Sequence, residues 1–294
     1  MSLYSISDSN RTKTWIILGV FLLLNIAVGY VLAFIYNDSA ILYGAVIVSL
    51  ILNFASYWYS DKVVLSLAGA RPALRAEFFD LYNAVENLSI TAGLPMPKVY
   101  VVDDPAPNAF ATGRNKEHSV ICVTTGLLEI MDKNELQGVI AHELSHIGNY
   151  DILLSTILVV LAGFISILLN WFLHGGMRGR NGDDSRAGNV MAILGIILVL
   201  LSPLFATLLR LAVSRRREAL ADATGALLTR YPEGLASALE KISKYEKPMI
   251  HANDATAHLY ISNPFGAEGL KGMHKLFLTH PPIEERIASL RASL

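Results

Sequence analysis

The stretch VIAHELSHIGNYD, from Val139 to Asp151, decides the fold and carries the main functional signal of the sequence. Residues four apart lie on one face of an α-helix, so His142 and His146 project side by side. Two imidazoles at that spacing can bind one metal ion, and Glu143 can reach a water molecule on that ion. The stretch therefore predicts a helix with two metal ligands and a general base. The same H-E-x-x-H letters also occur by chance on polar helix faces, so a third ligand and a suitable setting are required.

The composition is that of a membrane protein. Of the 294 residues, 53% are hydrophobic and 17% are charged, whereas soluble domains have about 45–50% apolar and about 25% charged residues. The net charge is −1, and there is no P-loop or dinucleotide glycine fingerprint, so neither a nucleic-acid nor a nucleotide partner is predicted. The single cysteine, Cys122, excludes an intrachain disulfide and a cysteine-rich metal site. Within the apolar run SVICVT we expect it to be a buried strand residue rather than a nucleophile.

Four uncharged segments are long enough to cross a hydrocarbon layer, which takes about 20 apolar residues. They are Thr14–Tyr36, Ala40–Tyr59, Ile152–Leu173 and Ala187–Leu209. The first is too long for a cleavable signal peptide, and a second span follows it almost at once. The last two have an alternative interpretation as core helices of a soluble domain.

The basic residues predict the orientation of these spans. The short link between the first two spans has no basic residue, whereas basic residues flank the outer ends of the two apolar hairpins. The flanking basic residues are Arg11, Lys13, Lys62, Arg71, Arg75, Arg215, Arg216 and Arg217. By the positive-inside rule, both termini and the segment 60–151 are cytoplasmic. The loop between the last two spans argues partly against this orientation, because it carries Arg178, Arg180 and Arg186.

The segments outside the spans read as helices and short strands. Helical spacing at Leu74, Phe78, Leu81 and Val85 predicts a helix within 71–94, and PKVYVVDD, NAFATG and SVICVTTG predict strands. Asp132 and Glu135 resemble a capping box that opens the motif helix. The segment 218–246 after the fourth span is predicted to be helical.

A third metal ligand is predicted from heights above the membrane; the alternative for this residue, Glu218, is a solvated charge after a basic run. The local extension H-E-x-x-H-x-x-G-x-x-H fails, because Asn149 and Ile152 stand where its glycine and third histidine belong. At about 1.5 Å per helical residue, the two histidines lie roughly 9 and 15 Å before Ile152, and Glu218 lies roughly 14 Å after Leu209. In an antiparallel hairpin whose helices continue into the cytoplasm, Glu218 reaches the level of the histidines. Asp222, one turn on, suits a carboxylate that orients a ligating imidazole.

The sequence resembles the HtpX family of bacterial membrane-bound zinc metalloproteases, which are relatives of the CAAX prenyl proteases. The resemblance covers nearly the whole chain and rests on four motifs: HELSH, EALAD, NAFATG and the THPP tail. The resemblance implies an α+β, mostly helical fold with four transmembrane helices and a cytoplasmic, gluzincin-like protease domain carrying a small β-sheet. It also implies one Zn²⁺ per chain, the bacterial inner membrane as location, and a role in membrane protein quality control. The partners expected are the lipid bilayer and protein substrates.

The same resemblance adds three residues to the predicted site. His280 and Arg286 match family positions that contact the substrate or the transition state, and are predicted to be catalytic. Asn108 matches a position on an edge strand beside the cleft, where an extended peptide can add as a strand. Each has a simpler alternative: a surface histidine for His280 and a turn asparagine for Asn108.

The predicted organisation has four parts: an N-terminal transmembrane hairpin (1–60), a first protease segment (61–151), a second hairpin (152–209) and a second protease segment (210–294). In this scheme Zn²⁺ is held by His142, His146 and Glu218, and Glu143 is the general base. Two other functions stay open. A membrane scaffold with a structural metal is disfavoured because structural zinc sites normally close all four positions, often with cysteines. An intramembrane site-2-type protease is disfavoured because IGNYD separates the motif from the apolar run.

Overall fold

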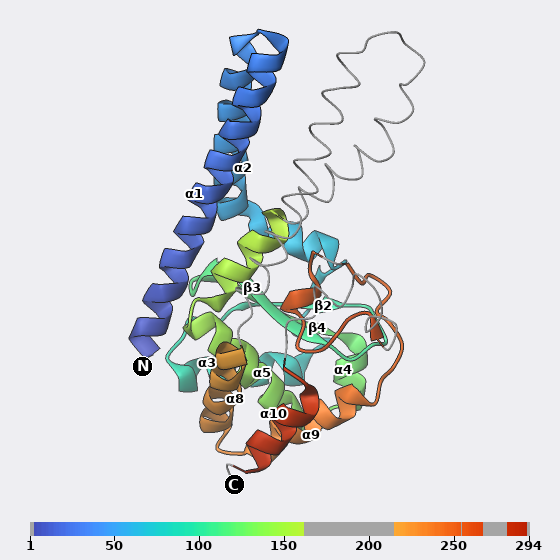
Figure 1. Cartoon of the computed structure of the whole chain (residues 1–294). Coiled ribbons are helices and arrows are strands. Elements are labelled where there is room, and N and C mark those ends of the chain that lie inside the picture. The colour runs from blue at the N-terminus through green and yellow to red at the C-terminus, as the bar shows by residue number, and fades with distance from the viewer. Residues whose placement is uncertain (1–2, 162–214, 254, 267–280, 293–294) are drawn as a thin grey trace.

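The computed structural model describes residues 3–161, 215–253, 255–266 and 281–292. Two long helices, α1 (Leu3–Tyr36) and α2 (Ser39–Leu67), lie side by side and project from a body of shorter helices packed around one sheet (Figure 1). The chain reverses between them at Asn37, whose φ of 53° is left-handed, and Asp38 caps α2 by accepting a hydrogen bond from the backbone N–H of Ala40.

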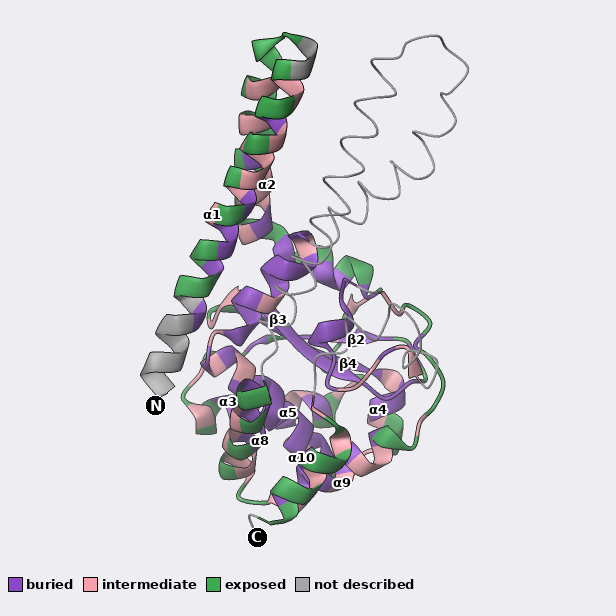
Figure 2. Ribbon diagram, viewed as in Figure 1, coloured by how far each residue is buried: buried purple, intermediate pink, exposed green. Residues whose placement is uncertain are grey.

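Both long helices carry apolar stretches that are long enough to cross a membrane, at Thr12–Phe34 and Ser39–Leu67. In Figure 2 exposed residues recur along the whole length of this hairpin, whereas the buried residues gather in the sheet and α5. Many of the exposed residues of the hairpin are large and apolar, among them Trp15, Leu23, Phe34, Tyr43, Ile51 and Phe54. An apolar surface of this extent fits a lipid environment, and the first two predicted spans are helices long and apolar enough to cross a membrane.

α2 continues eight residues beyond Tyr59, the predicted end of the second span. Between Tyr59 and Gly69 the sequence has no glycine or proline that could end the helix, and Gly69 itself has a left-handed φ of 66°. The polar residues that follow Tyr59 therefore extend the same helix as it enters the body.

Among the described residues the sheet has four strands, in the order β1-β2-β4-β3. The strands are β1 (Arg71–Pro72), β2 (Lys98–Val102), β3 (Ala109–Asn115) and β4 (His118–Thr124). β2 and β4 are parallel, and the two outer strands are antiparallel to their neighbours. The three strands predicted from the apolar runs are confirmed, and Cys122 is a fully buried residue of β4. β3 forms one edge of the sheet.

The helix predicted within 71–94 is shorter than its apolar spacing indicated. α3 covers Phe79–Ala92, and Leu74 lies in a turn before it with 63% of its surface exposed. Because Arg71–Pro72 pairs with β2, the chain must turn before a helix can begin, and the backbone N–H groups of Glu77 and Phe78 bond the carbonyl of Leu74 within that turn.

α5 (Lys133–Gly148) carries the H-E-x-x-H motif and is central to the body. Its predicted capping box is confirmed: Asp132 accepts from the N–H of Glu135, and the Glu135 carboxylate accepts from the N–H of Asp132. The sheet, α3, α8 (Arg215–Thr229) and α9 (Pro232–Ser243) surround α5. His142 and Glu143 are consequently buried although they are polar, and His146 is partly exposed.

Two glycines let the neighbouring helices approach α5 at backbone distance. A Cβ on Gly138 would lie 2.6 Å from the backbone nitrogen of Leu235 in α9. A Cβ on Gly225 of α8 would lie 3.1 Å from the backbone nitrogen of His142. α8 therefore crosses α5 at the first histidine of the motif.

Three shorter elements complete the body around these helices. They are α4 (Thr125–Ile130), the 3₁₀ turn η1 (Ala257–Leu259) and α10 (Ile283–Arg291). The helical segment predicted for 218–246 is divided in two, because Arg230 adopts a left-handed φ of 54° and Pro232 begins α9.

A further helix, Asp151–Leu161, follows α5 at a bend of 83°. It is the first part of the third predicted span; the rest of that span and the fourth, Ala187–Leu209, lie outside the described residues. By length and composition, the described residues contain two membrane-crossing helices, or three if the bent pair forms one span. The α+β, mostly helical fold with a small sheet is confirmed, and the number of four spans stays a prediction.

Candidate active site

Three side chains from two helices bring their donor atoms together in the body. His142 and His146 extend from one face of α5, and Glu218 from the facing turn of α8; their ligand atoms all lie within 4.8 Å of one another. The two Nε2 atoms are 3.2 Å apart, and the Glu218 oxygens lie 3.8 Å from His142 Nε2 and 3.7 Å from His146 Nε2. A tetrahedral metal with bonds of about 2.0–2.2 Å has ligand atoms about 3.3–3.6 Å apart. The donor set therefore fits one metal ion in type and in spacing.

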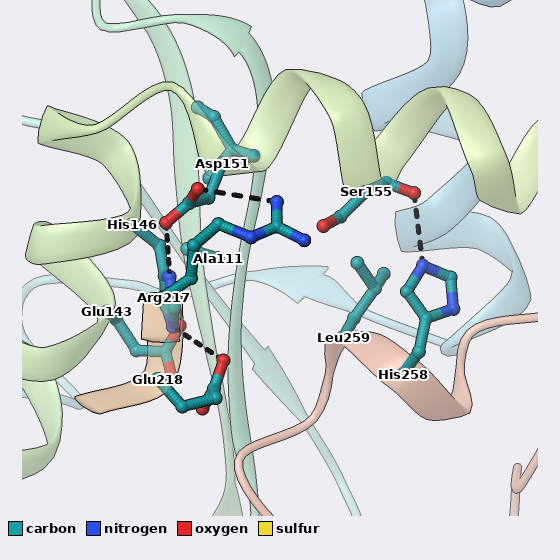
Figure 3. Close-up of a pocket in the computed structure, with 10 residues that line it drawn as sticks. Ala111, Glu143, His146, Asp151, Ser155, Arg217, Glu218, His258 and Leu259 are labelled. Carbon is teal, nitrogen blue, oxygen red and sulfur yellow. Dashed lines mark hydrogen bonds and ion pairs between the residues drawn. The ribbon is translucent and has the colours of Figure 1, made fainter. Parts of the chain in front are cut away.

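Glu143 lines the same pocket as His146 and Glu218 (Figure 3). It follows His142 directly in α5 and is buried. Ser155, His258 and Leu259 lie on the opposite side of the pocket, where His258 Nε2 is 3.2 Å from the carbonyl oxygen of Ser155. The pocket is thus lined by the Glu143 carboxylate and candidate metal ligands on one side and by residues of other chain segments on the other.

His142 contacts a buried ion pair, formed by Asp222 and Arg286, through its Nδ1 atom. Its Nδ1 lies 2.9 Å from Asp222 Oδ1, one turn after Glu218 in α8. Arg286 of α10 donates to both oxygens of Asp222, at 2.9 and 2.7 Å. Burial raises the pKa of Asp222, but its hydrogen bonds to His142 and Arg286 outweigh burial and lower the pKa to about 2. Asp222 is therefore a carboxylate that accepts the imidazole N–H.

His146 has a similar arrangement with different partners. Its Nδ1 lies 3.0 Å from Asp151 Oδ2 (Figure 3). The other oxygen of Asp151 lies 3.5 Å from the guanidinium of Arg217 and 2.6 Å from the side-chain nitrogen of Asn10. Each histidine thus has one nitrogen on a carboxylate and presents the other to the cluster.

The two imidazoles differ in charge preference without a metal. Burial lowers the pKa of His142 to about 4, because the charged ring would lose its hydration. Burial also lowers the pKa of His146, but its hydrogen bond to Asp151 and the negative charges of Glu218, Asp151 and Glu143 raise it to about 9. A neutral ring is the ligating form of histidine, so a metal competes with a proton mainly at His146.

The comparisons with known proteins identify this arrangement. The model of peptidase family M48 matches residues 75–294, which include α5, α8 and α10. The chain belongs to peptidase family M48. It is 47% identical over 299 residues to a protease HtpX homolog of Caldanaerobacter subterraneus subsp. tengcongensis, over 99% of this chain and 98% of that protein. It is also 48% identical over 293 residues to a protease HtpX homolog of Dictyoglomus turgidum, over 98% of this chain and 94% of that protein.

A solved structure is also similar. The crystal structure of S. mikatae Ste24p aligns with a TM-score of 0.50 and 18% identity, over 98% of this chain and 67% of that one. At that identity the likeness concerns the fold alone. The resemblance to the HtpX family is confirmed by the sequence relatives, and with the two apolar helices it makes the chain a membrane-bound M48 metalloprotease.

The other predicted site residues of this M48 protein lie in different surroundings. Asn108 is buried; its side chain donates to the carbonyl of Ser262 and accepts from the N–H groups of Ala109 and Ser262. It thereby joins the start of β3 to the segment that follows η1. Ala111, farther along β3, lines the pocket. His280 lies outside the described residues.

Sequence reasoning did not identify Asn10, Asp151, Arg217 or His258 as parts of the site. Asp151 had a weak local signal, a carboxylate just past the motif helix. Asn10 had none, because 141 residues separate it from Asp151. Membership in M48 implies a metal ion, and among the described residues the group that can hold one is His142, His146 and Glu218.

Proposed function

We propose that this M48 protein is a zinc endopeptidase whose ion is held by His142, His146 and Glu218, with Glu143 as the general base. The observation that carries the proposal is the cluster of three ligand atoms within 4.8 Å, with Glu143 in the same pocket. Two imidazoles and one carboxylate suit zinc, and three protein ligands leave the open position that catalytic zinc sites keep. Hard ions such as Mg²⁺ and Ca²⁺ prefer oxygen ligands alone.

When bound, zinc supplies Lewis acidity that polarises a peptide carbonyl and makes a water molecule easier to deprotonate. The carboxylate of Glu143 accepts a proton from the attacking water and delivers it to the leaving amine nitrogen. Asp222 accepts the Nδ1–H of His142, which fixes the tautomer whose Nε2 faces the cluster.

Arg286 acts in this scheme through Asp222. It is 4% exposed, and its two shortest hydrogen bonds go to the carboxylate of Asp222, while its guanidinium lies farther from His142 Nε2, at 3.4 Å, and from Glu218 Oε2, at 3.9 Å. We therefore assign it as a positioning residue in place of the direct catalytic role that the sequence suggested. His280 keeps its proposed role near the substrate on the resemblance alone.

The substrate is proposed to be an extended polypeptide that adds beside β3. β3 is one of the two edge strands among the described residues, and Ala111 lines the pocket with Glu143. An edge strand offers backbone groups to an incoming peptide wherever they are not already bonded, and at the start of β3 the Ala109 carbonyl already bonds the N–H of Ile261. Asn108 helps by holding the start of β3 against the segment at Ser262, through which it shapes the cleft.

We further propose that the protease works at the cytoplasmic face of a bacterial inner membrane, on membrane or misfolded proteins, in protein quality control. The basic residues that flank the first hairpin favour a cytoplasmic body. The names of the relatives, protease HtpX homologs, fit this role. Four spans and the division at 60, 151 and 209 belong to the same proposal.

A proteolysis assay on the full chain tests the function. Detergent-purified protein is stripped with a chelator and incubated with casein, with and without Zn²⁺, beside the variant Glu143→Gln. We expect zinc-dependent cleavage by the wild type alone, and equal zinc content in both proteins, because the variant loses the base and keeps the ligands. Cleavage by Glu143→Gln, or by the stripped wild type, would contradict the mechanism.

A further inference from the structure

Asp151 occupies the bend between the motif helix and the helix that leads into the third predicted span. The two helix axes differ by 83°. Tyr150 makes the turn with a left-handed φ of 59°, an uncommon conformation for a residue other than glycine. The turn brings the carboxylate of Asp151 back onto His146, five residues earlier.

The carboxylate of Asp151 has buried partners on three separate elements. Oδ2 lies 3.0 Å from His146 Nδ1 on α5, and Oδ1 lies 3.5 Å from Arg217 Nη1 on α8. Oδ1 also accepts a 2.6 Å hydrogen bond from Asn10 Nδ2 on α1. All but His146, which is partly exposed, are buried residues. A buried carboxylate needs such partners to offset the loss of hydration.

Asn10 precedes the first candidate span, Thr12–Phe34, on the same helix. It is 1% exposed, and its Nδ2 donates a second hydrogen bond, 3.1 Å long, to the carbonyl oxygen of Asn149. One amide group therefore bridges the carbonyl before the bend and the carboxylate after it. This contact fixes the N-terminal end of α1 to the end of the motif helix.

We propose that Asp151 and Asn10 are positioning residues for the metal site: Asp151 orients His146, and Asn10 holds Asp151, so that the first membrane helix is part of the support of the active site. Asp151 accepts the Nδ1–H of His146, which leaves Nε2 as the nitrogen that faces His142 and Glu218. Arg217 links the same carboxylate to α8, directly before Glu218. The inference rests on the proposed metal site.

The test is a double-mutant cycle on metal affinity in the full-length, detergent-purified chain. The variants are Asn10→Ala, Asp151→Asn and the pair; Asp151→Asn keeps the volume of the side chain and so limits misfolding. Asn25→Ala is the matched control, because Asn25 lies on the same helix and, within the described part of the chain, its side chain bonds only the carbonyl of Phe21. Zn²⁺ affinity is measured by chelator competition, and the visible spectrum of the Co²⁺-loaded protein reports the ligand geometry.

We expect Asp151→Asn to lower the affinity by about 10–100-fold. Asn10→Ala should lower it by about 3–10-fold, the equivalent of one hydrogen bond. The double variant should bind no more weakly than Asp151→Asn, because Asn10 acts through Asp151. The Co²⁺ spectrum should change in both single variants, and Asn25→Ala should match the wild type in both measurements.

Three results would overturn the inference. The first is wild-type affinity and spectrum in Asn10→Ala. The second is an additive loss in the double variant, which would show that Asn10 acts by another route. The third is a wild type that binds no Zn²⁺ or Co²⁺, which would remove the proposed metal site as well. The first two results leave the proposed function intact, so the failures are distinguishable.

Discussion

Nδ1 of His142 lies 2.9 Å from the carboxylate of Asp222, and that carboxylate is itself held by two hydrogen bonds from Arg286. α5, α8 and α10 thus meet at one buried histidine. The orientation of a proposed metal ligand in this protein involves an ion pair between two other helices.

Replacing Asp222 tests that dependence. Asp222→Ala should weaken Zn²⁺ binding by about 10–100-fold, because His142 loses its acceptor and Arg286 is left buried without its carboxylate. Chelator competition measures the change. Asp80→Ala is the control, since Asp80 is an exposed residue of α3. Unchanged affinity in Asp222→Ala would show that His142 needs no such support.

Gly138→Ala should destabilise the body without touching the metal site. The added Cβ would lie 2.6 Å from the backbone nitrogen of Leu235, so α5 and α9 must separate. Overpacking of this kind costs about 1–3 kcal/mol, and Tm should fall in a thermal melt of the metal-free protein. Gly148→Ala on the same helix is the matched control, because its Cβ would meet only the Leu94 side chain at 3.8 Å. Equal melting of the two variants would contradict the close approach.

Cys122 should be inert to alkylation in the folded protein. It is fully buried in β4, and burial together with the negative charge of Glu143 raises the pKa of its thiol well above the usual range. Iodoacetamide at mildly alkaline pH should label it only after denaturation, as intact mass would show. A cysteine placed by Thr91→Cys on the exposed surface of α3 should react at once. Rapid labelling of native Cys122 would mean that the sheet opens.

The elements that sequence predicted well have local causes. The capping box at Asp132 and Glu135 is a relation between residues three apart, and the common face of His142 and His146 follows from helix geometry. The position of Glu218 near the histidines could be predicted because the rise per residue of a helix is fixed, and the structure does bring Glu218 to the two histidines.

The features that sequence missed depend on contacts between distant segments. Nothing near Asn10 indicates that its amide meets Asp151, 141 residues away. Leu74 has helical spacing with later residues, but the pairing of Arg71 with β2 keeps it outside α3. The hydrogen bonds of Arg286 to Asp222 likewise depend on the packing of α10 against α8, which the sequence does not show.

The metal content of Glu218→Ala tests the central claim most directly. Wild type, Glu218→Ala and the control Glu129→Ala, at an exposed position of α4, are purified in detergent, loaded with Zn²⁺, desalted and measured by elemental analysis. We expect about one zinc per chain in the wild type and the control, and almost none in Glu218→Ala, because two histidines alone do not hold a catalytic zinc ion. A Glu218→Ala protein that keeps one tightly bound zinc per chain would contradict the assignment of Glu218 and the site built on it.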